Sequence, residues 1–163
     1  MKILYFDVLS LFYSNEYFHR NASIHAKYKE WFNTRTKTLL EMVEPDFQAI
    51  GNLRDAASEA GLLLYPFGSC YDREYLIEHG VFSSDELAPE TALPLRMQMD
   101  DNNPVRRMIA HAYRLNAQWY VCGDIGSEEL LQPYPERYLR SDFGKGVTSQ
   151  LISKIRGLKS ADY

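Results

Sequence analysis

The sequence predicts an α/β protein with a doubly wound, mainly parallel sheet and a small helical insertion after the first strand. Short apolar runs at 3–6, 62–65 and 119–122 suit buried strands, and segments with helical apolar spacing separate them. Strands that alternate with helices imply right-handed crossovers and helices on both faces of a parallel sheet. An extra helical segment, 22–43, stands between the first strand and its expected crossover helix. This segment is the predicted insertion.

The first apolar run starts almost at the N-terminus and is interrupted by one acidic residue, Asp7. In open parallel sheets, functional groups gather at the carboxyl ends of strands. Asp7 is therefore placed where a catalytic carboxylate would lie. The alternative is that Asp7 caps the turn that follows.

The remaining elements follow in order along the chain. The insertion shows helical spacing from Ile24 to Met42, with a break near Asn33 and Thr34. We expect the other helices at 45–60, opened by Pro45, at 71–79, at 104–115 and from Thr148 to 158, and a short fourth strand at 137–140. The segment 82–103 has no regular pattern.

Length and charge limit the kind of protein. At 163 residues the chain is expected to form one domain, 1–163, with a full core of its own. A net charge of −4 argues against a nucleic-acid partner, because backbone binding depends on basic residues. No apolar run approaches the length of a membrane span, and two cysteines without a framework spacing favour a reducing compartment. We therefore expect a cytoplasmic protein with no membrane partner.

Asp7 and Asp124 have parallel contexts, since each ends an apolar strand and begins a loop. If the two strands are neighbours, both carboxylates lie at one rim of the sheet. Mg²⁺ takes one or two protein carboxylates together with phosphate oxygens and water. The pair is therefore a candidate magnesium site, with loop capping by both aspartates as the alternative.

The stretch 5–12, with Asp7 at the end of strand one, resembles the first motif of the haloacid dehalogenase-like (HAD) hydrolases. Further segments resemble the small bacterial HAD domain of the Swiss Army Knife RNA-repair proteins. These segments are 44–47 before the crossover helix, 61–69 as the second strand and motif-two loop, 119–124 as the motif-four strand, and 146–148 before the last helix. The resemblance implies a Rossmann-like, HAD-like fold.

The resemblance also implies roles for individual residues. Asp7 would be the nucleophile, and Asp7 with Asp124 would hold Mg²⁺. Ser69 would supply the motif-two hydroxyl, and Arg106 or Arg107 the motif-three cation. The list of expected catalytic residues is thus Asp7, Ser69, Arg106 and Arg107.

Three positions depart from the family pattern. The acid/base Asp is replaced by Leu9, the small Gly after it by Ser10, and the second acid of motif four by Ile125. A positioned acid/base contributes roughly 10²–10⁴-fold to a rate. We therefore expect a binding or regulatory protein with a degenerate site and weak or no catalysis, whose partner is a small phosphorylated ligand or a protein. The alternatives are a Mg²⁺-dependent phosphohydrolase with Asp7 as nucleophile and a metal-independent, dehalogenase-like hydrolase.

Overall fold

The computed structural model describes residues 1–68, 71–92, 103–126 and 128–161. Its centre is a four-stranded parallel sheet with the order β2-β1-β3-β4. The strands are β1 (Lys2–Phe6), β2 (Leu63–Pro66), β3 (Gln118–Cys122) and β4 (Tyr138–Leu139). The fold is therefore mixed α/β with a Rossmann-like arrangement, as the alternation of strands and helices predicts.

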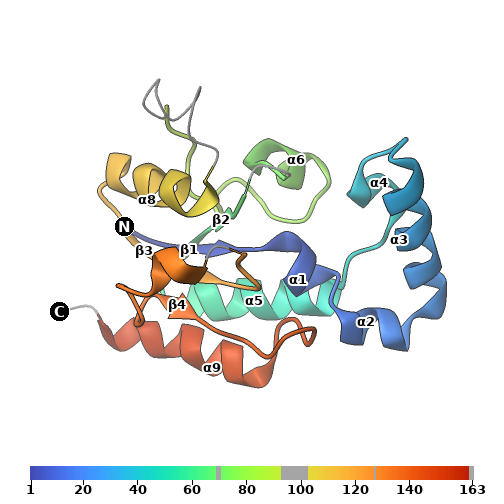
Figure 1. Ribbon diagram of the computed structural model, residues 1–163. Coiled ribbons are helices and arrows are strands. Elements are labelled where there is room, and N and C mark those ends of the chain that lie inside the picture. The colour runs from blue at the N-terminus through green and yellow to red at the C-terminus, as the bar shows by residue number, and fades with distance from the viewer. Residues whose placement is uncertain (69–70, 93–102, 127, 162–163) are drawn as a thin grey trace.

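Helices lie on both sides of this sheet (Figure 1). On one side α5 (Phe47–Glu59) and α9 (Ser149–Gly157) pack against each other, and α8 (Pro104–Arg114) covers the opposite side. The remaining elements are α1 (Val8–Phe12), α2 (Asn15–Arg20), α3 (Ala22–Thr34), α4 (Leu39–Met42), α6 (Arg73–Glu78), η1 (Glu128–Leu131) and η2 (Leu158–Ala161).

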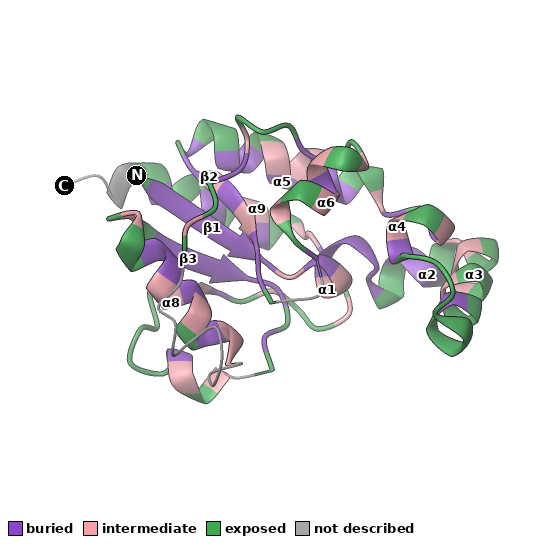
Figure 2. Ribbon diagram, turned by 90° about the horizontal axis from the view of Figure 1, so that it is seen from above, coloured by how far each residue is buried: buried purple, intermediate pink, exposed green. Residues whose placement is uncertain are grey.

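Side-chain alternation along the strands produces two cores. Leu4 and Phe6 of β1 point into the core shared with α5 and α9, whereas Ile3 and Tyr5 point toward α8. All five residues of β1 are buried, in keeping with a central strand of a parallel sheet (Figure 2). This burial explains why the strand reads as a continuous apolar run.

The helical insertion is present, with boundaries that refine the expectation. It consists of α3 and α4, joined by a turn at Arg35, and α2 precedes it. The three helices project beyond α1, past the carboxyl ends of the strands, and most residues of α3 are exposed (Figures 1 and 2). Trp31 is the one buried residue of α3.

Some predicted boundaries shift by a few residues. The crossover helix α5 begins at Phe47, because Asp46 accepts a hydrogen bond from the Ala49 amide and caps it. Pro45 therefore precedes the helix instead of opening it. The helix expected at 71–79 is shorter, 73–78, because Asp72 caps it in the same way. Helix α2 has no counterpart in the sequence prediction.

The strand order creates a switch point between β1 and β3. From β1 the chain crosses to β2 on one side and later returns to β3 on the other. Ligands of open α/β sheets bind where connections from neighbouring strands diverge in this way, at the carboxyl ends. Across the described segments, no helix has both the length and the apolar character that a bilayer span requires.

Candidate functional site

Asp7 and Asp124 follow the two neighbouring central strands. Phe6 of β1 is in register with Cys122 of β3, and the Asp7 amide donates to the Cys122 carbonyl oxygen over 3.2 Å. The prediction that the two aspartates end adjacent parallel strands is confirmed. The loops that carry them are in direct contact at the switch point.

Asp7 is a helix cap as well as a strand end. Its Oδ2 accepts the Ser10 amide hydrogen over 3.0 Å, which makes Asp7 the N-cap of α1. Burial raises the pKa of the Asp7 carboxyl, hydrogen bonds from Ser10 oppose this, and the charge of Asp124 raises the pKa further. The capping role expected as the alternative is therefore real, and the repulsion from Asp124 is one that a bound cation would relieve.

Ser10 links the two aspartate loops. Its Oγ accepts the Asp124 amide hydrogen over 2.9 Å, and its side chain also hydrogen-bonds the Asp7 carboxylate. In the sequence Ser10 counts only as a departure from the family pattern. The signal for its role is its place three residues after a capping Asp, at the start of a helix whose N-terminus faces the second loop.

Gly123 allows the two loops to approach. Its φ is +105°, and a Cβ atom built on it would lie 2.8 Å from Cβ of Asp7. Only glycine combines that backbone conformation with the lack of a side chain. The Asp7 and Asp124 loops are thus held at a separation that any other residue would enlarge.

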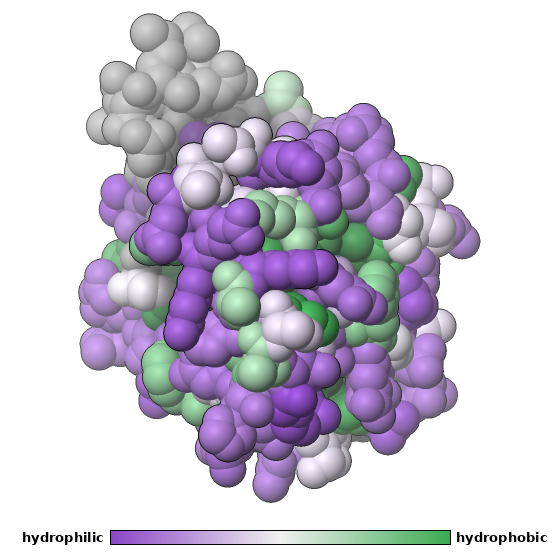
Figure 3. Space-filling model, turned by 90° about the vertical axis from the view of Figure 1, so that its right-hand side faces the viewer, coloured by the Kyte–Doolittle hydropathy of each residue, from purple (hydrophilic) through white to green (hydrophobic). Residues whose placement is uncertain are grey.

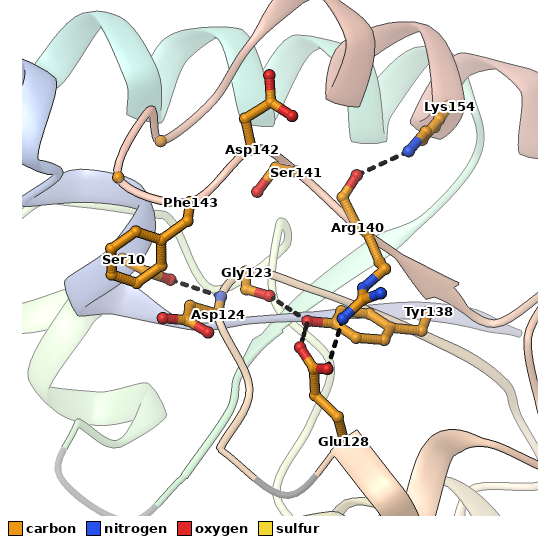
Figure 4. Close-up of a pocket in the computed structure, with 12 residues that line it drawn as sticks. Ser10, Gly123, Asp124, Glu128, Tyr138, Arg140, Ser141, Asp142, Phe143 and Lys154 are labelled. Carbon is orange, nitrogen blue, oxygen red and sulfur yellow. Dashed lines mark hydrogen bonds and ion pairs between the residues drawn. The ribbon is translucent and has the colours of Figure 1, made fainter.

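A pocket of about 420 Å³ opens beside Ser10, Gly123 and Asp124 (Figure 4). We call it the polar pocket. Its other wall includes Glu128, Tyr138, Arg140, Asp142 and Lys154, contributed by the segment after β3 and by α9.

Two of the five charged side chains that line the polar pocket, Arg140 and Glu128, pair with each other. The Tyr138 hydroxyl lies 3.0 Å from the Gly123 carbonyl oxygen and 3.1 Å from Glu128 Oε1. The Lys154 ammonium donates to the Arg140 carbonyl oxygen over 2.8 Å (Figure 4). The hydrogen bonds from Arg140 and Tyr138 lower the pKa of Glu128. These residues hold the carboxyl end of β4 to the Gly123 loop.

A second pocket, of about 520 Å³, lies on the other side of α1. We call it the aromatic pocket, because five aromatic side chains from the insertion and the α6 region line it: Tyr28, Trp31, Phe32, Tyr71 and Tyr75. Leu9 lines this pocket, whereas Ser10 lines the polar one. Successive residues of a helix point about 100° apart, so α1 presents one residue to each pocket.

The structure describes two of the other residues predicted for the site, Arg106 and Arg107. Arg106 and Arg107 are in the first turns of α8, Arg106 exposed and Arg107 half-buried, and neither lines the polar pocket. Ser69 lies outside the described residues. Ile125, where the resemblance implies a second acid, is 1% exposed and packs in the core beneath α8.

Asp7 and Asp124 are the residues that could hold a divalent cation. Among the residues that the structure describes, no group of three or more His, Cys, Asp or Glu side chains converges. Mg²⁺ needs only one or two protein carboxylates when water and phosphate supply the other ligands. Asp7 and Asp124, on contacting loops, meet that requirement in chemistry and in number.

Comparison of the chain with protein-family models, with curated proteins and with solved structures finds no match. The site is therefore interpreted from its geometry.

Proposed function

We propose that the chain is a HAD-like domain with a degenerate active site, which binds a ligand and does not turn over phosphate esters efficiently. The observation that carries this proposal is the place of the two apolar substitutions. Leu9 lines the aromatic pocket, and Ile125 is packed in the core. Neither apolar side chain can transfer a proton or add negative charge at these positions.

The role of Asp7 supports the same proposal. Its carboxylate receives hydrogen bonds from Ser10 and caps α1. A nucleophilic carboxylate must present a free oxygen to the substrate, and the acid/base partner must protonate the leaving group. The cap occupies Oδ2 of Asp7, and for the second function position 9 has no acid, because Leu9 stands there.

The Mg²⁺-dependent phosphohydrolase stays as the second candidate, because one observation favours it. The two aspartates end adjacent strands at the switch point, and the charge of Asp124 raises the pKa of Asp7. A carboxylate can attack phosphorus without a proton relay of its own. In this reading Asp7 is the nucleophile and Asp124 a magnesium ligand.

A turnover assay separates the two functions. Wild-type protein, Asp7→Asn and Leu9→Asp are incubated with Mg²⁺ and p-nitrophenyl phosphate, and released phosphate is measured. Asp7→Asn keeps the cap but removes the nucleophile, so it also identifies contaminating phosphatase. We expect wild type and Asp7→Asn to release phosphate at the same background rate.

Leu9→Asp tests how far the site has diverged. Because Leu9 faces the aromatic pocket, we expect the new carboxylate to recover none of the roughly 10²–10⁴-fold that an acid/base supplies. Wild-type turnover that disappears in Asp7→Asn would refute the proposal and establish the phosphohydrolase. Recovery in Leu9→Asp would show a site that lacks only one group.

A further inference from the structure

The aromatic pocket has two walls from separate parts of the chain. Helix α3 contributes Tyr28 and Trp31, whose ring centres are 5.6 Å apart, and the α6 region contributes Tyr71 and Tyr75, whose rings stack at 6.1 Å. The Tyr75 hydroxyl accepts the Leu40 amide hydrogen over 2.9 Å and joins the walls. The pocket is thus a built feature between the insertion and the sheet domain.

Five aromatic side chains around one pocket favour a flat ligand. Phe32 lines the pocket and yet is 57% exposed, so part of its ring is open to a partner. Nucleobases stack on Tyr, Trp and Phe side chains whatever their sequence, because every base has a π face. Leu9 adds an apolar surface to this pocket. A carboxylate at the same position would repel the electron-rich face of an aromatic ligand.

The charge of the pocket favours an anion. Arg35 and Lys37 line it, and neither forms an ion pair with any carboxylate in the described part of the chain. The guanidinium carbon of Arg35 lies 4.2 Å from the centre of the Trp31 ring and 5.1 Å from that of Phe32. The Arg35 Nε donates to the Phe32 carbonyl oxygen over 3.4 Å, so the two terminal NH₂ groups of the stacked guanidinium are the donors left for a phosphate, which they can bind in a bidentate manner.

The backbone around Arg35 keeps this arrangement in place. Arg35 caps α3 with φ of 52°, a left-handed conformation in which glycine is usual, and the Trp31 indole donates to the Lys37 carbonyl oxygen over 2.9 Å. The Arg35 guanidinium and the Lys37 backbone are therefore both held beside the Trp31 ring.

One acidic residue also lines the pocket. Asp72 is exposed, and its Oδ1 accepts the Tyr75 amide hydrogen over 2.8 Å. A carboxylate at this place suits sugar hydroxyl groups, which donate hydrogen bonds to it. The pocket thus offers rings for a base, an acceptor for a sugar and two cations for a phosphate.

We propose that the aromatic pocket binds a nucleoside monophosphate, with the base among the aromatic rings and the phosphate on Arg35 and Lys37. The inference extends the proposed function, since it names the ligand class of a domain that binds without turnover. The volume of about 520 Å³ is within the range of small-molecule sites. Figure 3 shows apolar side chains on this side of the molecule interrupted by hydrophilic ones, which fits a small ligand better than a broad protein contact.

The chain offers its own reporter for the test. It has two tryptophans, and Trp119, which is 8% exposed, does not line the aromatic pocket. In a Trp119→Phe background, fluorescence reports Trp31 alone. The 5′-monophosphates of adenosine, guanosine, cytidine and uridine are titrated separately. The four nucleosides and inorganic phosphate are titrated for comparison.

We expect at least one nucleotide to quench the fluorescence of Trp31 in a saturable manner. Its nucleoside and inorganic phosphate should each bind at least about tenfold more weakly than the nucleotide. Arg35→Gln should lower nucleotide affinity about tenfold and leave nucleoside affinity unchanged. Lys29→Gln removes a cation from an exposed position of the same helix that does not line the pocket, and should change neither affinity.

Three results would overturn the proposal: no quenching by any of the four nucleotides, nucleosides that bind as tightly as nucleotides, or equal effects of Arg35→Gln and Lys29→Gln. Circular dichroism of each variant confirms that it is folded. Phosphate release measured in the same samples separates this inference from the proposed function. A nucleotide that binds and is hydrolysed only when Asp7 is present supports the aromatic site and refutes the non-catalytic role.

Discussion

The two pockets beside α1 differ in the partners of their positively charged side chains. In the polar pocket, Arg140 is paired with Glu128, and Lys154 donates to a backbone carbonyl oxygen. In the aromatic pocket, Arg35 and Lys37 have no carboxylate partner among the described residues, and Phe32 is largely exposed. The ion pair between Arg140 and Glu128 holds loops together. Cations without a carboxylate partner, beside the exposed Phe32 ring, are available to a ligand.

The two sides of the short helix α1 have different roles. The Ser10 side fixes the loops that end β1 and β3, and the Leu9 side faces the insertion. A catalytic domain needs its chemistry on the side where Asp7 and Asp124 meet. Ser10 and Gly123, beside that meeting point, hold the two loops in contact.

The largest expected effect concerns the contact between the two aspartate loops. Gly123→Ala should lower the free energy of unfolding by about 3 kcal/mol, because its φ is +105° and the new Cβ would lie 2.8 Å from Cβ of Asp7. Urea denaturation followed by circular dichroism measures the change.

Gly126→Ala is the matched control. Gly126 belongs to the same loop, and a Cβ there would meet no atom within 4 Å. We expect a change within about 0.5 kcal/mol for this variant. Equal effects of the two substitutions would show that the polar side of α1 is not held by close approach of its loops.

A second prediction tests whether Asp7 is kept for more than its cap. Asp7→Ala should cost about 1 kcal/mol, because the Ser10 amide loses its acceptor. Asp7→Asn keeps an equally good cap and removes a partly buried charge near Asp124, so it should be more stable than wild type at pH 7.

The pH dependence of that difference has a definite sign. The pKa of Asp7 is raised in the folded chain, so the unfolded chain releases the proton more easily and the contribution of Asp7 to stability falls as pH rises through the carboxyl range. The higher stability of Asp7→Asn should therefore vanish well below about pH 4, where Asp7 of the wild type is protonated in both the folded and the unfolded chain. Thermal unfolding of both proteins across pH 3–7 measures it, and an advantage that is constant with pH would contradict the assigned charge effect.

The sequence predicts the frame of this site better than its details. The adjacency of Asp7 and Asp124 follows from two strands with the same context, because parallel strands end at one rim. Glu128 lies in a segment for which no element was predicted, whereas Tyr138 and Arg140 lie in the predicted strand 137–140, and only tertiary contacts bring the three residues to Gly123. Sequence patterns carry no signal for such contacts.

Helix α2 was not predicted for a related reason. Its six residues contain only Tyr17 and Phe18 as buried positions, too few to show a helical period. Ser14 caps the helix, and the Tyr17 hydroxyl donates to the Glu44 carbonyl oxygen. Long-range hydrogen bonding and capping stabilise this element where local apolar spacing does not.

The smallest expected effect separates ligand binding from folding on the aromatic side. Phe32 and Phe47 are each 57% exposed, but only Phe32 lines the aromatic pocket. Side chains this exposed contribute little to folding, so Phe32→Ala and Phe47→Ala should each change the free energy of unfolding by no more than about 0.5 kcal/mol. Nucleotide quenching of Trp31 should weaken about three- to tenfold in Phe32→Ala alone, because a stacked base loses part of its aromatic surface. A destabilised Phe32→Ala would assign Phe32 to the packing of the insertion. Equal quenching in both variants would remove it from the ligand site, and the two pockets would then differ in charge pairing alone.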